Sequence, residues 1–173
     1  MNAKQYLEKM VGYVESENAV DLRVVSNDMI DEAAVTQDKT FVTLSLIAYA
    51  LSKIMSKPHL LKSDRWDGFK KHVIEHLSDG PKPVLLDEVV QDVREFDEEE
   101  GNYVTDIIDK ARMKQASRVY ALGLSLSQAC ELTGADMSLV SSYVGTTKIH
   151  ERPYSRSGTV AQRYKNARKV LGG

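Results

Sequence analysis

Apolar residues recur at helical spacing along most of this 173-residue chain. Residues 2–17, for example, place Tyr6, Met10, Val11 and Val14 on one face, which is the pattern of an amphipathic helix. The same periodicity predicts helices over residues 20–35, 38–55, 64–77, 84–96 and 103–122, and a short basic helix over 160–171. No segment shows the persuasive apolar–polar alternation of a half-buried strand, so we expect an all-α protein.

Capping and helix-breaking residues set the expected helix boundaries. Ser26 is expected to cap the second helix, and Asn102 to cap the long helix that ends before Gly123. Residues 38–55 are apolar on most sides, and their length favours a buried helix over a strand. Pro58 ends that helix, because the residue before a proline avoids the helical conformation.

The segment LSLSQACELTGADMSLVSSYVG, which begins at residue 124, carries the most informative pattern. Ser125 and Gln128 have the spacing of a capping box at a helix start. Gly134 can supply a tight turn, and Asp136 can cap a second helix. The expected elements are a helix over 126–133 and a second over 137–144. A helix, a short turn with glycine and a second helix describe a helix-turn-helix, with an ordinary helical hairpin as the alternative.

The outward side of the second of these helices is uncharged. Its expected outward residues are Met137, Ser138, Ser141 and Ser142, and the three serines are candidate nucleic-acid contacts. Recognition helices commonly read base edges with Arg, Lys, Asn or Gln, whereas serine can hydrogen-bond to any base and so discriminates weakly. The uncharged surface therefore also allows the unit to pack against a protein.

Charge is distributed unevenly along the chain. Residues 1–109 carry 12 basic and 22 acidic side chains, a balance of −10, and residues 110–173 carry 11 basic and 3 acidic, a balance of +8, which together give the net −2. Such asymmetry is typical of proteins that bind nucleic acid or a partner. We expect an acidic helical bundle over 1–100, for partner binding or dimerisation, joined by the long helix to a basic nucleic-acid-binding region over 101–173. The acidic run 97–100 is expected to be a solvated helix end, with a contact to basic residues as the alternative.

The basic residues of the second half lie beside the helix-turn-helix. Lys110, Lys114 and Arg118 recur every four residues and share one face of the long helix, while Arg112 lies off that face. The other predicted nucleic-acid contacts follow the motif: Lys148, Arg152, Arg156, Arg163, Lys165, Arg168 and Lys169. This layout predicts affinity that is dominated by phosphate contacts and weakened by salt. The alternative is that these cations pair with the acidic first half.

Composition narrows the class of protein. A hydrophobic content of 42% is enough for a folded core, and the single cysteine, Cys130, fits a reducing compartment. The N-terminus lacks the apolar region of a signal peptide, and the longest apolar stretch, residues 41–55, is shorter than the roughly 20 residues that cross a bilayer. We therefore expect a cytoplasmic protein without a membrane segment, and neither enzymatic activity nor a cofactor.

One stretch resembles a metal motif. His72, Glu75 and His76 have the H-x-x-E-H order of inverted zinc peptidases, and histidines one helical turn apart can reach one metal ion. A catalytic zinc needs a third protein ligand. The candidates downstream, Glu88, Glu95 and Glu98, lie in no confirming motif. A surface helix is favoured, and a zinc-dependent hydrolase is a remote alternative.

Residues 98–153 resemble a group of small, mostly uncharacterised archaeal proteins that combine a helical N-terminal region with a helix-turn-helix-like C-terminal region. The likeness is carried by KARMKQASRVYALGLSLSQA (110–129), ELTGAD (131–136) and YVGTTKIHERP (143–153), and covers about a third of the chain. These proteins are similar to those regarded as antitoxins encoded beside PIN-domain ribonucleases. The resemblance implies nucleic-acid binding and a PIN-domain nuclease as partner, and no catalytic residues.

These observations favour a DNA-binding regulator that acts as the antitoxin of a PIN-domain ribonuclease. A homodimer is expected, because helix-turn-helix proteins commonly meet two half-sites. RNA binding is a variant of this hypothesis, since phosphate contacts do not distinguish the two polymers. A protein–protein interaction module without DNA binding is the main alternative.

Overall fold

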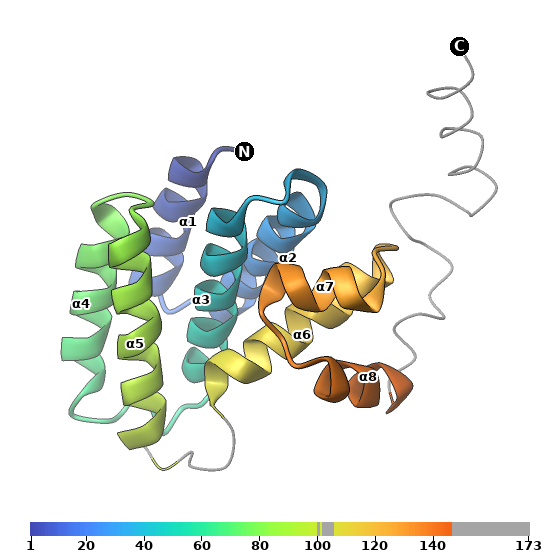
Figure 1. Cartoon of the computed structure of the whole chain (residues 1–173). Helices are drawn as coiled ribbons and strands as arrows, with labels where there is room; N and C mark the ends of the chain where they lie inside the picture. Colours follow the sequence, from blue (N-terminus) through green and yellow to red (C-terminus); the bar gives the residue numbers. More distant parts are fainter. Residues whose placement is uncertain (100, 102–105, 147–173) are drawn as a thin grey trace, which may run out of the picture.

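The computed structural model describes residues 1–99, 101 and 106–146. Within these residues the protein is all-α, as predicted, with eight helices and no strand (Figure 1). The helices are α1 (Ala3–Glu15), α2 (Ala19–Thr36), α3 (Lys39–Met55), α4 (Trp66–Ser78), α5 (Pro83–Glu99), α6 (Ile107–Ala121), α7 (Leu126–Thr133) and α8 (Met137–Thr146). The expected helix over 160–171 lies outside the described residues.

Asparagine side chains begin the first two helices. The Asn2 side chain accepts a hydrogen bond from the Gln5 N–H, and the Gln5 side chain accepts one from the Asn2 N–H, which forms a complete capping box. Asn18 accepts from the Asp21 N–H at 3.1 Å and caps α2. The prediction that Ser26 caps this helix is therefore wrong, because an earlier and equally good capping residue begins it.

Ser26 instead lies buried in the middle of α2 and joins three helices. Its Oγ donates to the Ser45 carbonyl oxygen on α3 at 2.8 Å, and the Ser45 Oγ donates to the Ser26 carbonyl oxygen at 2.9 Å. The Gln115 side-chain amide on α6 donates to Ser26 Oγ at 2.7 Å. A buried polar group is stable where it is hydrogen-bonded, so this network fixes how α2, α3 and α6 meet.

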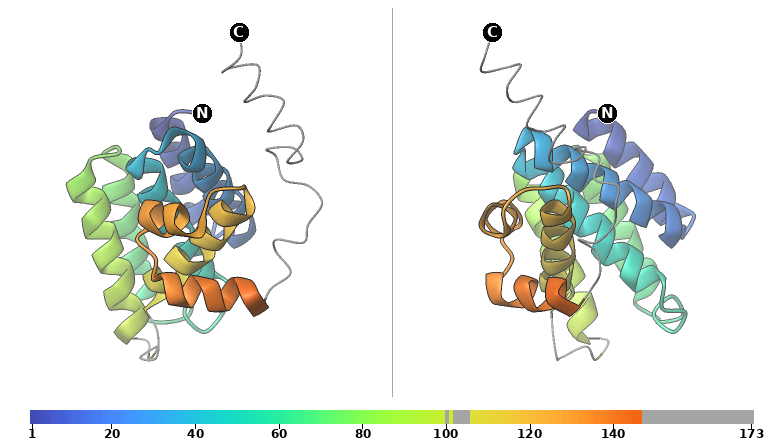
Figure 2. Two further views of the ribbon diagram at one scale, coloured as in Figure 1. Left: turned by 45° about the vertical axis from the view of Figure 1, so that its right-hand side comes forward. Right: turned by 90° about the vertical axis from the view of Figure 1, so that its right-hand side faces the viewer.

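Helix α3 is the central element, and α1, α2, α5, α6 and α7 all contact it (Figures 1 and 2). Thirteen of its 17 residues are buried, which explains why its sequence is apolar on most sides. Helices α4 and α5 cover the side of the bundle away from α7 and α8 (Figure 1). Between them, Phe69 stacks on Phe96 with ring centres 4.4 Å apart.

Two boundaries differ from those expected. Helix α6 begins at Ile107 rather than at residue 103, because Asp106 caps it by accepting from the Ile108 N–H at 2.7 Å; the expected cap, Asn102, lies outside the described residues. Helix α5 continues into the acidic run. Asp97 is buried, and its carboxylate lies 3.9 Å from the Lys57 ammonium, while Glu99 forms an ion pair with Arg65. These two acidic side chains therefore contact basic residues of the first half of the chain.

The main hydrophobic core contains residues from both the acidic first part and the basic second part of the chain. Ile108, Ala111 and Val119 of α6, with Ala129 and Leu132 of α7, are buried in the same cluster as the residues of α1 to α5. The acidic and basic parts of the described chain therefore share one core. None of the described helices is both long and apolar enough to cross a membrane.

Candidate nucleic-acid interface and the adjoining cationic pocket

Helices α7 and α8 form the helix, turn and helix expected from the sequence. Ser125 and Gln128 make both hydrogen bonds of the predicted capping box. Gly134 ends α7 with φ 69°, in the left-handed region that favours glycine, and its N–H donates to the Cys130 carbonyl oxygen at 2.8 Å. Asp136 then accepts from the Leu139 N–H at 3.0 Å and begins α8.

A small hydrophobic cluster holds α8 to α6 and α7. Its buried members are Ala116, Cys130, Val140 and Val144. Cys130 is the small residue at the helix contact, as expected, and burial raises the pKa of its thiol. Val140 and Val144 are the buried residues of α8, and the side of the helix opposite them is exposed.

The exposed side of α8 carries the predicted uncharged residues. Ser138, Ser141 and Ser142 are all exposed. The Ser138 hydroxyl donates to Asp136 Oδ1 at 2.8 Å, and hydrogen bonds from the Leu139 N–H and from Ser138 lower the pKa of Asp136. Met137 and Leu139 are 48% and 51% exposed. Among the described residues, this surface offers the Ser141 and Ser142 hydroxyl groups and apolar side chains, and its charged group is the Asp136 carboxylate at the start of α8.

Of the four predicted cations of α6, two form ion pairs and two do not. Arg118 forms an ion pair with Asp31 of α2, and Arg112 lies 3.1 Å from Asp109 one turn earlier on α6. Lys110 and Lys114 have no acidic partner within ion-pair distance among the described residues. Lys110, Lys114 and Arg118 therefore do not act as one free basic face, because Arg118 is paired with Asp31 of the first half.

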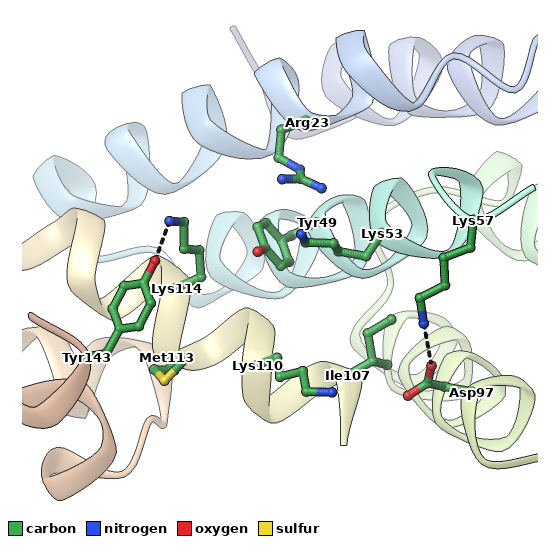
Figure 3. Close-up of a pocket in the computed structure, with 10 residues that line it drawn as sticks. All are labelled: Arg23, Tyr49, Lys53, Lys57, Asp97, Ile107, Lys110, Met113, Lys114 and Tyr143. Carbon is green, nitrogen blue, oxygen red and sulfur yellow. Dashed lines mark hydrogen bonds and ion pairs between the residues drawn. The ribbon is translucent and has the colours of Figure 1, made fainter. Parts of the chain in front are cut away.

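Lys110 and Lys114 line a pocket of about 470 Å³ between α2, α3 and α6, which we call the cationic pocket (Figure 3). Arg23, Lys53 and Lys57 complete its basic lining, and Asp97 is the acidic residue in it. Tyr49 and Tyr143 contribute aromatic rings, and the Lys114 ammonium donates to the Tyr143 hydroxyl at 2.6 Å. The pocket thus touches α8 through Tyr143.

Crowding of like charges is the main electrostatic feature of this pocket. Burial of part of its side chain and the positive charges of Arg23, Lys114 and Lys57 lower the pKa of Lys53. The Arg23 Nε donates to Ser52 Oγ at 2.8 Å, and its guanidinium carbon lies 4.5 Å from the centre of the Tyr49 ring. Burial also raises the pKa of Tyr49, so its hydroxyl stays neutral.

Sequence reasoning did not find Arg23, Lys53 or Lys57, because it counted them in the acidic half. Lys53 was the available signal, since it is a lone cation near the end of a helix that is otherwise buried. Nothing local in the sequence indicates that α2 and α6 meet beside it. The predicted contacts Lys148, Arg152, Arg156, Arg163, Lys165, Arg168 and Lys169 lie outside the described residues.

The histidine pair forms a separate polar group between α4 and α5. His72 Nδ1 lies 3.1 Å from Asp92 Oδ2, and His76 Nε2 lies 3.0 Å from Glu88 Oε2. Potential ligand atoms of His72, His76 and Asp92 lie within 4.8 Å of one another, and Asp92 was not among the ligands considered from the sequence. Glu75 lies 3.9 Å from Lys71.

Comparisons with protein-family models, with curated proteins and with solved structures give no match to this chain. The resemblance to the archaeal proteins therefore stays a prediction that rests on the sequence blocks quoted above.

Proposed function

We propose that the protein binds duplex DNA through the exposed side of α8 and the cations beside it, and acts as a regulator. The observation that carries the proposal is the capped α7–turn–α8 unit with Lys110 and Lys114 on the adjoining helix. In such units the second helix enters the major groove while neighbouring elements contact the backbone.

The chemistry of this surface favours phosphate contacts over base reading. The serine hydroxyls can bond to a phosphate oxygen or to either kind of base, so they discriminate weakly. The lysines, with the predicted contacts of the C-terminal region, supply the positive charge. Binding should therefore be tight at low salt and only weakly dependent on DNA sequence.

Fluorescence anisotropy with a labelled duplex tests the proposal. The affinity is expected to fall about a thousandfold or more between about 50 and 200 mM salt, as for other proteins that make six or more phosphate contacts. The double variant Lys110→Gln/Lys114→Gln should reduce the log–log salt slope by about 2. The matched control is Lys4→Gln/Lys9→Gln on the exposed side of α1. Absence of binding at the lowest salt contradicts the proposal.

The proposed partner is a PIN-domain ribonuclease, to which the protein would act as antitoxin. Besides the sequence resemblance, its support is an acidic groove of about 560 Å³ beside α2, to which Asp28 and Glu32 contribute, while Asp31 in its lining is paired with Arg118. A basic surface of a nuclease would complement it. Co-expression with a PIN nuclease encoded by the adjacent gene should give one complex in size-exclusion chromatography. Light scattering on the protein alone tests the expected homodimer.

A protein-docking role for α8 is the second candidate, and the exposure of Met137 and Leu139 favours it. Exposed apolar side chains are more typical of a protein contact than of a DNA backbone contact. The double variant Met137→Ser/Leu139→Ser separates the two roles. Loss of a protein complex with DNA affinity unchanged supports docking, whereas a large loss of DNA affinity supports the first proposal.

A further inference from the structure

We infer that the cationic pocket binds a small phosphorylated molecule of the nucleotide class. Four of its cations, Arg23, Lys53, Lys110 and Lys114, form no ion pair with an acidic side chain in the part of the chain that the structure describes. Asp97, the acidic residue of the lining, lies 3.9 Å from the fifth cation, Lys57. The pocket is therefore positively charged.

Such an arrangement is costly without an anion. Like charges brought together repel one another, most strongly between the half-buried Arg23 and Lys114, because solvent screens the exposed Lys53 and Lys110. The pKa of Lys53 is lowered by partial burial and then by the positive charges of Arg23, Lys114 and Lys57. A bound phosphate would convert the repulsion into charge-assisted hydrogen bonds.

The shape of the pocket favours a small ligand over a duplex. Its volume of about 470 Å³ lies within the range of roughly 300–1,000 Å³ typical of small-molecule sites. The cations come from α2, α3 and α6 and surround one space, so they can contact several oxygens of one molecule (Figure 3). A duplex is too wide to enter and could present only phosphates at the rim.

The lining also supplies two kinds of group that recognise a nucleotide. Arg23 carries a planar guanidinium, held in place by its hydrogen bond to Ser52, and such a group can bind two phosphate oxygens at once. The lysines act as point charges around it. Tyr143 lies at the α8 side, where the Lys114 ammonium lies 5.1 Å from the centre of its half-buried ring, and a base that stacked on this ring would lie beside that ammonium.

The pocket and α8 are connected through Lys114, whose ammonium lines the pocket and donates to the Tyr143 hydroxyl. A ligand phosphate would compete for Lys110 and Lys114, which are the cations assigned above to DNA. This consequence rests on the proposed DNA binding, and it makes the ligand an inhibitor of that binding, with equal and reciprocal coupling.

Calorimetric titration of the full chain at low salt tests the inference, with ATP, inorganic pyrophosphate and uncharged adenosine as probes. ATP and pyrophosphate are expected to bind saturably with one site per chain, and adenosine not to bind. Lys53→Gln and Arg23→Gln should each weaken binding about tenfold or more, the loss expected for one charge-assisted contact. Because Arg23→Gln also removes a hydrogen bond to Ser52, Lys53→Gln serves as the variant that keeps the packing.

The double variant Lys4→Gln/Lys9→Gln is the matched control, because it removes two exposed lysines of α1 that do not line the pocket. Its ATP affinity should equal that of the unaltered chain. The inference is overturned if neither ATP nor pyrophosphate binds saturably. It is also overturned if binding survives in Lys53→Gln but is lost in the control variant.

DNA anisotropy with and without pyrophosphate distinguishes this inference from the proposed function. Pyrophosphate is expected to lower the DNA affinity of the unaltered chain and to leave that of Lys53→Gln unchanged. If DNA never binds but pyrophosphate does, the inference stands and the proposed function fails. If Lys53→Gln weakens DNA binding and pyrophosphate never binds, the pocket is a DNA-phosphate site, and the inference is overturned.

Discussion

Arg118 on α6 donates two hydrogen bonds to Asp31 on α2, from Nε to Oδ1 at 2.6 Å and from Nη2 to Oδ2 at 2.8 Å. Arg118 was predicted to contact nucleic acid, yet its guanidinium is held by a carboxylate of the acidic half. Part of the charge asymmetry of the chain is therefore internal pairing across α2 and α6, which agrees with the alternative that sequence analysis left open.

Replacing Arg118 should affect stability more than DNA affinity. Arg118→Ala leaves the nearly buried carboxylate of Asp31 without this partner, and the guanidinium is partly exposed, so we expect a loss of about 1–3 kcal/mol in the free energy of unfolding. Urea denaturation measures it, with Asp31→Asn completing a double-mutant cycle. An Arg118→Ala variant of unchanged stability with weakened DNA binding would show that the pair opens to bind DNA.

Two glycines of different backbone conformation should respond oppositely to alanine. At Gly134 an added Cβ meets only Arg112 Nε, at 3.7 Å, but φ is +69°, so Gly134→Ala is expected to cost about 1–2 kcal/mol. Gly12 lies inside α1 with open space around it, so Gly12→Ala should stabilise by about 0.5–1 kcal/mol. Thermal denaturation of both variants checks the pair. Stabilisation by Gly134→Ala would contradict the left-handed turn.

The contact between α4 and α5 should be more stable at pH 6 than at pH 8. The pKa of His76 is raised, chiefly by its hydrogen bond with the His72 carbonyl oxygen and also by Glu88 and Asp92, so its contribution is present below pH 6.5 and is lost as the pH rises through the raised folded value.

The measurement is the melting temperature between pH 6 and pH 8, compared between the unaltered chain and His76→Gln. The difference between the two should shrink as the pH rises. His59→Gln, at an exposed site, is the control for the loss of a histidine. A difference that grows with pH would mean that His76 is neutral in the folded protein.

Glu17 should stabilise the contact between the α1–α2 turn and α4. Its Oε1 accepts from the Trp66 indole at 2.9 Å and lies 2.9 Å from the Lys70 ammonium, and these hydrogen bonds lower its pKa. Glu17→Ala leaves the N–H of a buried tryptophan unsatisfied, which costs about 1–3 kcal/mol, whereas Glu17→Gln keeps an acceptor and should cost less. Urea denaturation ranks the two variants, and equal losses would assign the effect to charge alone.

Local patterns predicted the helices well, because periodicity and capping act within a few residues. The capping box at Ser125 and the turn at Gly134 are present where the sequence placed them. Ser26 was misassigned because its partners, Ser45 and Gln115, lie on other helices. The cationic pocket was missed for the same reason, since Arg23 and Lys53 meet Lys114 only after α2, α3 and α6 pack together.

The small cluster beneath α8 gives this protein an internal reporter. Cys130 is the single cysteine of the chain and lies buried where α6, α7 and α8 meet, so a thiol reagent reaches it when this contact opens. The labelling rate of the unmodified chain thus counts openings of the second helix of the motif, without any introduced probe. Ligands that hold α8 closed, or partners that draw it away, would register as a slower or a faster reaction at this one sulfur.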